Sequence, residues 1–370
     1  MGAASQSWVL DALGLFGADE TARCLAPLVQ VWPGESAHQR AVKGLDVLLA
    51  IGTDVALMQL HSISQKVKFK GIKDQAQARI DALADQLGLT PAQLADRLVP
   101  DLGLGADGTM VLDFGDKTFT VGFDEQLRPT IADEQGKPRK SLPKTTTEPG
   151  ASAVKTFAAL KKDVRAIANL QLRRLEEAMV TQRGWTVKDF TTYLVEHPLV
   201  WHLTRRLVWR CDNGFFRVAE DKTFAGVDDE VFAPAGTVTV AHRLDLGDQA
   251  TTWASLLADY EIAQPFPQVG RDTYTADQVA ALDGVTVPTG KVLGLESRGW
   301  RRGSAEDHGW QTTIDRPVLD GTVWRLGLDP GIVVDMPMMN PEQTIRPSGL
   351  ASLDPITCSE ILRDLHGLHG

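Results

Sequence analysis

Apolar side chains recur at helical spacing through the first hundred residues. The clearest stripe holds Ile72, Ala76, Ile80, Leu83 and Leu87, and residues 54–68 carry a shorter one. Glycine and proline interrupt the pattern at short intervals. We therefore predict stacked helical pairs over residues 1–105, arranged as in HEAT-like repeats, which bury a continuous core only by stacking. This region holds fewer helical pairs than a stable array usually has. We therefore expect the chain to be the C-terminal part of a longer solenoid protein.

Two capping signals give helix starts. Thr90 and Gln93 have the spacing of a capping box ahead of a helix that ends near Leu98. Thr186 and Asp189 repeat that spacing ahead of a helix that ends near His197, which precedes a proline. These signals predict short helices at both places.

The apolar period changes from helical spacing to strict alternation after residue 106. Met110, Leu112 and Phe114 alternate with other residues, and so do Phe119 and Val121 after a Gly-Asp turn. We predict a β-hairpin or meander, followed by a polar linker, over residues 106–150.

Residues 151–180 have the pattern of one long helix, and short strand-like runs follow residue 207. The predicted strands and helices do not alternate regularly, so the pattern does not indicate a doubly wound sheet. The predicted fold class is α+β, with a helical-repeat region (1–105), a β-hairpin or meander with its linker (106–150), a basic helical segment (151–210) and a mixed α+β domain (211–370).

Charge restricts the classes of partner. The chain has a net charge of −10, which argues against a protein that coats nucleic acid over its whole surface. Residues 151–210 hold 11 Lys and Arg against 5 Asp and Glu, a net charge of +6, so the remainder carries −16. This local excess keeps nucleic-acid binding open, although a solvated helix face explains it as well.

The sequence also indicates a compartment. It has no apolar run long enough to cross a bilayer and no export signal at its start, so we predict a cytoplasmic protein without membrane contact. Cys24, Cys211 and Cys358 are widely spaced and form no C-x-x-C pair, and we interpret them as buried small apolar residues in a reducing compartment.

Several familiar motifs are absent or misplaced. Gly103, Gly105 and Gly108 spell G-x-G-x-x-G, but they follow a helix and precede strands, the reverse of a dinucleotide fold, so we interpret them as a loop. The histidines at 197 and 202 lack the spacing of a zinc motif. We predict no metal site, and the sequence identifies no cofactor.

The first candidate site is the run from Ala258 to Arg271. Its polar members are Asp259, Tyr260, Glu261, Gln268 and Arg271, which supply acids, a phenol, an amide and a cation within fourteen residues. The structural alternative is a helix end followed by a stiff segment, with Phe266 on the core and Arg271 paired to a carboxylate.

The second candidate site is the charged run from Glu296 to His308. Arg298, Arg301 and Arg302 surround Trp300, an arrangement that in single-strand binders grips phosphate and stacks on a base. An exposed turn with mixed salt bridges is the alternative. His308 adds a candidate acid or base to the first group.

Several runs together resemble a known family. They include residues 61–70, 97–104, 119–125, 258–271 and 298–303, so the resemblance spans nearly the whole chain. The family is the bacterial domain of unknown function 4132, which includes MolR-like proteins. The resemblance implies helical repeats and a WGR domain upstream, membership in regulatory or conflict-type systems, and sometimes a neighbouring MoxR-type ATPase. It supplies no catalytic residues, and a WGR-based function is not carried over because this chain shows no WGR segment.

Two functional hypotheses follow. The first is a non-catalytic binding or scaffold module in a larger assembly, with a protein partner, by resemblance an AAA-type ATPase, or nucleic acid bound through the basic segment. The second is an enzyme of unrecognised type whose pocket gathers the 258–271 and 296–308 segments. Convergence of both segments on one concave pocket would favour the enzyme.

Overall fold

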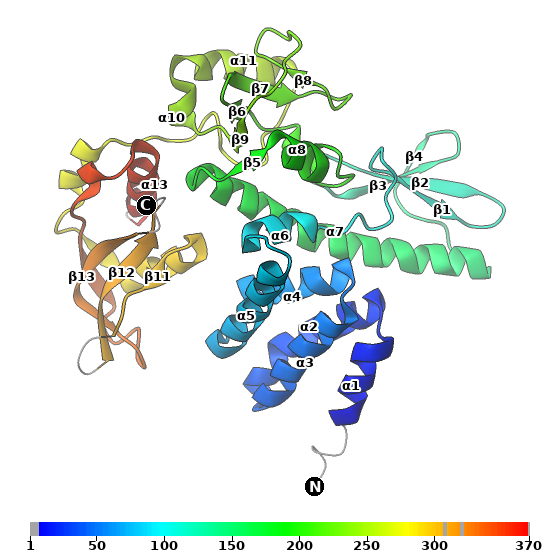
Figure 1. Cartoon of the computed structure of the whole chain (residues 1–370), viewed down its shortest axis with the longest axis horizontal. Helices are drawn as coiled ribbons and strands as arrows, with labels where there is room; N and C mark the ends of the chain where they lie inside the picture. The colour runs from blue at the N-terminus through cyan, green and yellow to red at the C-terminus, as the bar shows by residue number, and fades with distance from the viewer. Residues whose placement is uncertain (1–6, 306–308, 319–321, 369–370) are drawn as a thin grey trace. The chain divides into compact units, whose positions relative to one another are not determined.

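The computed structural model describes residues 7–305, 309–318 and 322–368 (Figure 1). The chain divides into two compact units. One comprises Met1–Leu170 and Thr191–His202, and the other comprises Gln171–Phe190 and Leu203–Gly370. The described residues form helices and three antiparallel sheets, which confirms the mixed α+β fold. The four segment boundaries remain predictions.

Short helices open the first unit. They are α1 (Ser7–Phe16), α2 (Asp19–Val31), η1 (Trp32–Glu35), α3 (His38–Ile51), α4 (Asp54–Lys66), α5 (Lys70–Gln86) and α6 (Pro91–Arg97). The predicted capping box starts α6, because Thr90 Oγ1 accepts the Gln93 N–H at 3.1 Å and Gln93 Oε1 accepts the Thr90 N–H at 2.9 Å. A HEAT-like repeat among these helices remains a prediction.

One apolar core holds these helices together. Ile72, Ala76 and Ile80 of α5 are completely buried in it, as their spacing predicts. Leu87 departs from the prediction and is 57% exposed, because α5 ends there and leaves the side chain no helix to pack against. Cys24 is also exposed, contrary to the prediction, whereas the other two cysteines are buried.

The predicted meander is a four-stranded antiparallel sheet in the order β1-β2-β3-β4. Its strands are β1 (Met110–Asp113), β2 (Thr118–Phe123), β3 (Pro129–Asp133) and β4 (Pro138–Arg139). Leu112, Phe119 and Val121 are buried on one face, as their alternation predicts. The three glycines of the G-x-G-x-x-G pattern lie between α6 and β1, which confirms the loop interpretation.

The long helix α7 (Glu148–Val180) begins three residues before its predicted start. Its portion in the first unit is anchored by Asp163, which is buried and accepts a hydrogen bond from Arg23 Nε at 2.6 Å. Burial raises the pKa of Asp163, and Arg23 opposes that effect. No described helix combines the length and apolar character needed to cross a membrane.

A five-stranded sheet in the order β5-β9-β6-β7-β8 forms one part of the second unit. Its strands are β5 (Gly184–Thr186), β6 (Trp209–Cys211), β7 (Gly214–Val218), β8 (Phe224–Ala225) and β9 (Thr237–Val240). The helices of this part are α8 (Val187–Phe190), α10 (Arg243–Leu246), η3 (Gly247–Gln249) and α11 (Ala250–Asp259). By contrast, η2 (Thr191–Val195) belongs to the first unit, and α9 (Trp201–Thr204) spans the division between the units after His202. The predicted cap starts α8, because Asp189 donates its N–H to Thr186 Oγ1 at 3.0 Å. The ring of Phe190 packs edge to face against Trp209 of β6 and Phe216 of β7.

A second sheet, in the order β10-β14-β13-β12-β11, completes this unit. Its strands are β10 (Thr286–Pro288), β11 (Arg301–Arg302), β12 (Trp310–Pro317), β13 (Val323–Val333) and β14 (Glu342–Arg346). The helices around it are η4 (Ala276–Ala281), α12 (Thr289–Gly294), η5 (Leu295–Arg298), η7 (Leu350–Ser352) and α13 (Pro355–His366). Ile361, Leu362 and Leu365 of α13 pack into the same core as the sheet. That core places the polar residues of α13 beside both candidate segments.

Candidate functional site

Arg271, the last residue of the first candidate segment, lies in a buried ion pair. It is 4% exposed and binds Glu360 of α13 in a bidentate manner, with Nε–Oε1 and Nη2–Oε2 distances of 2.5 and 2.7 Å. Its third nitrogen, Nη1, donates to Glu176 Oε1 at 2.8 Å. The guanidinium therefore joins α7 and α13 within the second unit.

His242 completes this network. The ring is fully buried, and its Nε2 lies 3.1 Å from Glu360 Oε1. Nδ1 accepts the Leu244 N–H at 3.2 Å, so a neutral ring carries its proton on Nε2 and donates it to Glu360. Burial alone would raise the pKa of Glu360, but hydrogen bonds from Arg271 and His242 and nearby positive charge lower it to about 2.

Gln268 is buried and serves the backbone of the sheet. Its Oε1 accepts the Val208 N–H at 2.9 Å, and its Nε2 donates to the carbonyls of Val208 and Ala241 at 2.6 and 2.9 Å. Phe266 beside it is 5% exposed. The side-chain amide therefore connects the two chain segments that flank strands β6 and β9.

Trp300, from the second candidate segment, is also buried against α13. It is 2% exposed and donates its indole N–H to Asp364 Oδ2 at 2.8 Å, while Arg298 Nη1 lies 3.1 Å from Asp364 Oδ1. A buried indole presents no face to a nucleic-acid base, so the structure corrects the predicted stacking role of Trp300. Arg301 is exposed, and Arg302 pairs with Glu296 at 2.6 Å. His308 lies outside the described residues.

The two candidate segments therefore meet on a helix. Arg271 binds Glu360, and Trp300 binds Asp364 one turn further along α13. Sequence reasoning missed both carboxylates, as well as His242, because nothing in their local pattern marks a partner that is distant in the chain. Among the described residues, no three His, Cys, Asp or Glu side chains lie close enough to hold a metal ion.

Tyr260 lies apart from this network, at the exposed end of α11. Its hydroxyl donates to Asp229 Oδ2 at 2.7 Å, and Arg217 Nη2 donates to Asp229 Oδ1 at the same distance. The guanidinium of Arg217 stacks on the Tyr260 ring, 4.3 Å from its centroid. Hydrogen bonds from Arg217 and Tyr260 lower the pKa of Asp229, so this carboxylate is charged at neutral pH.

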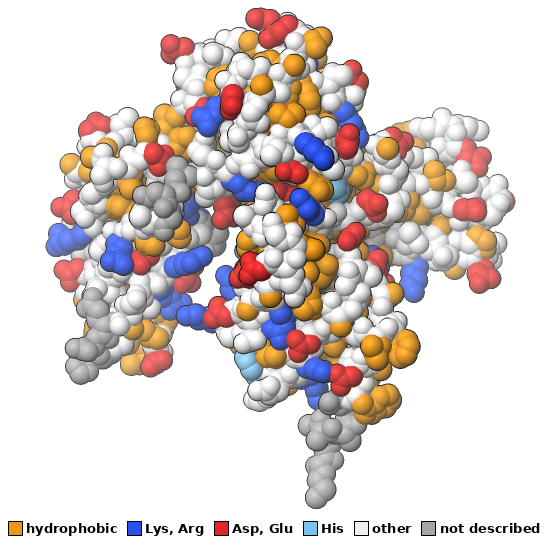
Figure 2. Space-filling model, viewed as in Figure 1, with side chains coloured by type: hydrophobic (Ala, Val, Ile, Leu, Met, Phe, Trp, Pro, Cys, Tyr) orange, Lys and Arg blue, Asp and Glu red, His pale blue; other side chains and the backbone are white. Residues whose placement is uncertain are grey.

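Exposed acidic side chains are frequent in residues 220–230 and 259–261, on either side of Tyr260 in the sequence, and Figure 2 shows acidic side chains in the region of β7, β8 and α11. We call this region the Tyr260 surface. It comprises Tyr260, Val231 and the seven acidic residues Glu220, Asp221, Asp228, Asp229, Glu230, Asp259 and Glu261. Val231 is 94% exposed, and Tyr260 is 45% exposed. The surface thus combines exposed apolar atoms with acidic side chains, which we call its rim.

Arg217 lies beneath the Tyr260 ring, and some of its N–H groups have no hydrogen-bond acceptor within the described part of the chain. The residue is 4% exposed, and only its Nη2 is paired. Its Nε and Nη1 make no hydrogen bond with the described residues. Two buried donors without acceptors are unusual in a folded protein.

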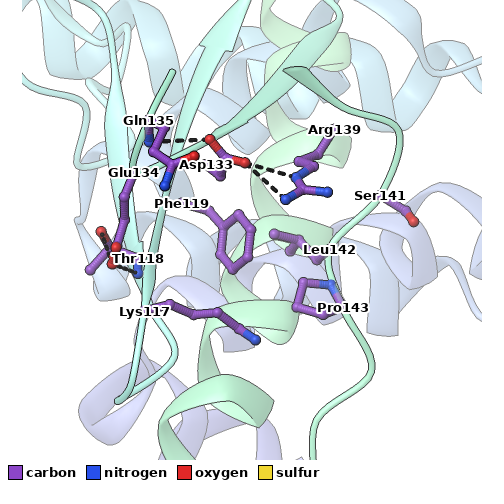
Figure 3. A pocket seen from close by; sticks show the side chains of 10 residues that line it. All are labelled: Lys117, Thr118, Phe119, Asp133, Glu134, Gln135, Arg139, Ser141, Leu142 and Pro143. Carbon is purple, nitrogen blue, oxygen red and sulfur yellow. Dashed lines mark hydrogen bonds and ion pairs between the residues drawn. The ribbon is translucent and has the colours of Figure 1, made fainter. Parts of the chain in front are cut away.

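The β1–β4 sheet carries a separate pocket of about 440 Å³, shown in Figure 3. Phe119, Leu142 and Pro143 supply its apolar lining, and Lys117 and Arg139 lie on either side of the Phe119 ring. Sequence reasoning did not nominate this pocket, because its walls come from β2, the β3–β4 turn and the linker, which meet only in the folded sheet.

A family model matches part of the chain. The model described as Domain of unknown function (DUF4132) covers residues 136–300, which include β5–β9 and the Tyr260 surface. The resemblance to this family that was seen in the sequence is confirmed over these residues.

One curated relative extends the match. The uncharacterized protein YehI of Escherichia coli strain K12 is 36% identical over 322 residues, which is 81% of this chain and 27% of the relative. The chain thus spans about a quarter of the length of that relative. No solved structure matches the chain significantly.

Proposed function

We propose that this chain is a non-catalytic docking module that holds a protein partner within a larger regulatory or conflict-type bacterial system. One observation carries the proposal. Arg271, Gln268 and Trp300, the least exposed of the residues first considered for chemistry, use their polar atoms to hold backbone and α13 in place. A group that must exchange protons or bind substrate needs access that these side chains lack.

The enzyme alternative required both charged segments to line one concave pocket. Arg271 and Trp300 instead converge on Glu360 and Asp364, and the pocket of Figure 3 is lined by other residues. This arrangement supports a structural role for the two segments and weakens the case for an unrecognised active site.

The Tyr260 surface is the place where we expect the partner to dock. Seven exposed carboxylates, together with an exposed valine and tyrosine, are complementary to a basic segment that carries an apolar or aromatic residue. The family resemblance makes a MoxR-type AAA ATPase the first partner to examine, and the HEAT-like helices of the first unit are proposed as part of the scaffold.

Fluorescence anisotropy of a dye-labelled Arg- and Lys-rich peptide with one tryptophan tests this docking surface. The double variant Asp228→Asn with Glu230→Gln removes two rim charges and should weaken binding about five- to tenfold. The matched control, Asp74→Asn with Asp85→Asn, makes the same change in net charge at exposed positions of α5 and should bind like the unmodified chain. Equal weakening in both variants, or none in either, would remove the Tyr260 surface from the account.

A further inference from the structure

The pocket on the β1–β4 sheet has the size and lining of a small-molecule site. Its volume of about 440 Å³ falls within the range of ligand pockets, roughly 300–1,000 Å³. Leu142 and Pro143 are half-buried in its wall, and Phe119, which is 6% exposed, adds the small part of its ring that reaches the surface. This lining fits a small apolar group.

The acidic residues of this pocket are committed to the sheet itself. Asp133 accepts the backbone N–H groups of Gln135 and Lys137 with one oxygen, and binds Arg139 Nε with the other at 3.0 Å. The Lys137 N–H, with help from Arg139, lowers the pKa of Asp133. Glu134 turns away from the Phe119 ring in Figure 3 and accepts the Thr118 N–H at 2.8 Å.

Of the two cations that line the pocket, Lys117 is less firmly paired with a carboxylate than Arg139. The Lys117 ammonium lies 4.0 Å from the carboxylate of Asp116, and Figure 3 shows it below the Phe119 ring. A 4.0 Å separation on an exposed surface contributes little, so this charge remains able to pair with a ligand. Arg139 lies on the other side of the ring and is held in place by Asp133.

We propose that this pocket binds a small apolar molecule that carries a carboxylate. The apolar part contacts Leu142, Pro143 and the exposed part of Phe119, and the carboxylate pairs with Lys117. The site is independent of the docking function, because it belongs to the first unit and shares no residue with the Tyr260 surface.

Equilibrium dialysis of the full chain with 2-naphthoate, and separately with its neutral amide, tests the proposal. The acid should bind with one-to-one stoichiometry and the amide about tenfold more weakly, which is the effect of one charge contact in a partly exposed site. Lys117→Gln should weaken binding of the acid by a similar factor, and Lys117→Arg should restore it. Lys140→Gln is the matched control, because Lys140 is exposed next to Arg139 without lining the pocket.

Two kinds of result would overturn this assignment. One is the absence of saturable binding of the acid at millimolar concentration. The other is an affinity that is the same for acid and amide, or that falls equally in the Lys117→Gln and Lys140→Gln variants. Retention of binding by Lys117→Arg shows that a loss in Lys117→Gln does not come from misfolding.

Discussion

Glu360 is the residue on which the interior of the second unit depends most. It receives two hydrogen bonds from Arg271 and lies 3.1 Å from His242 Nε2, while only 3% of its surface is exposed. Taking these charges out of water is costly, and the pair tolerates burial because the carboxylate oxygens are well matched by donors. Removal of one partner leaves the other charge buried without compensation.

The low pKa of Glu360 makes the stability of the protein depend on pH in a defined window. Its pKa falls from 4.5 in the unfolded chain to about 2 in the folded one. The stabilisation is therefore fully present above pH 4.5 and is lost as the pH falls toward 2. The difference corresponds to about 3 kcal/mol.

Urea unfolding at several pH values measures this effect. Glu360→Gln should be less stable than the unmodified chain by about 3 kcal/mol or more at pH 6, and the gap should narrow as the pH falls below 4.5. A gap that stays constant from pH 6 to pH 3 would show that the charge of Glu360 is not what stabilises the fold.

At the scale of a residue, sequence reasoning reached part of this result. The structural alternative for the 258–271 run, with Phe266 on the core and Arg271 paired to a carboxylate, matches the geometry. The identity of the carboxylate was beyond reach, because Glu360 lies 89 residues away and a side-chain pair at that separation leaves no periodic signal.

Helix α13 is the element that gathers both candidate segments. Its apolar face packs into the core, and its buried carboxylates at 360 and 364 receive Arg271 and Trp300. Asp354 caps its start by accepting the Thr357 N–H at 3.0 Å. The helix thus fixes the two charged segments through side chains as well as through packing.

Two variants separate the buried contact of Asp364 from its exposed one. Asp364→Ala leaves the Trp300 indole N–H buried without an acceptor and should lower the free energy of unfolding by about 2 to 3 kcal/mol. Arg298→Ala removes a partner that is 51% exposed and should cost about 0.5 kcal/mol. Similar losses in both variants, measured by urea unfolding, would contradict the anchoring role of Trp300.

Elements were predictable where their signals are local. The box at Thr90 and the cap at Thr186 both start helices, and the alternation around Phe119 forms a sheet. The assignment of Leu87 to the buried stripe of α5 was wrong, because periodicity does not show where a helix ends against solvent. The pocket beside Phe119 depends on three separate pieces of chain, and no single piece indicates it.

At the scale of the whole chain, charge decides which partner to expect. The net charge of −10 is unevenly distributed, and the acidic excess includes the Tyr260 surface. The arginines that surround Trp300 in sequence lose their stacking platform, because its ring is buried. We therefore propose a protein partner with a basic segment in preference to single-stranded nucleic acid.

A salt-dependent titration of the chain against two labelled probes tests the central claim most directly. One probe is the basic tryptophan-containing peptide and the other is a single-stranded DNA of mixed sequence. We predict that the peptide binds at low salt and loses affinity as salt rises, through the rim of the Tyr260 surface, while the DNA does not bind. Tight DNA binding that weakens steeply with salt, together with no binding of the peptide, would contradict the account and assign the basic residues between 151 and 210 a nucleic-acid function.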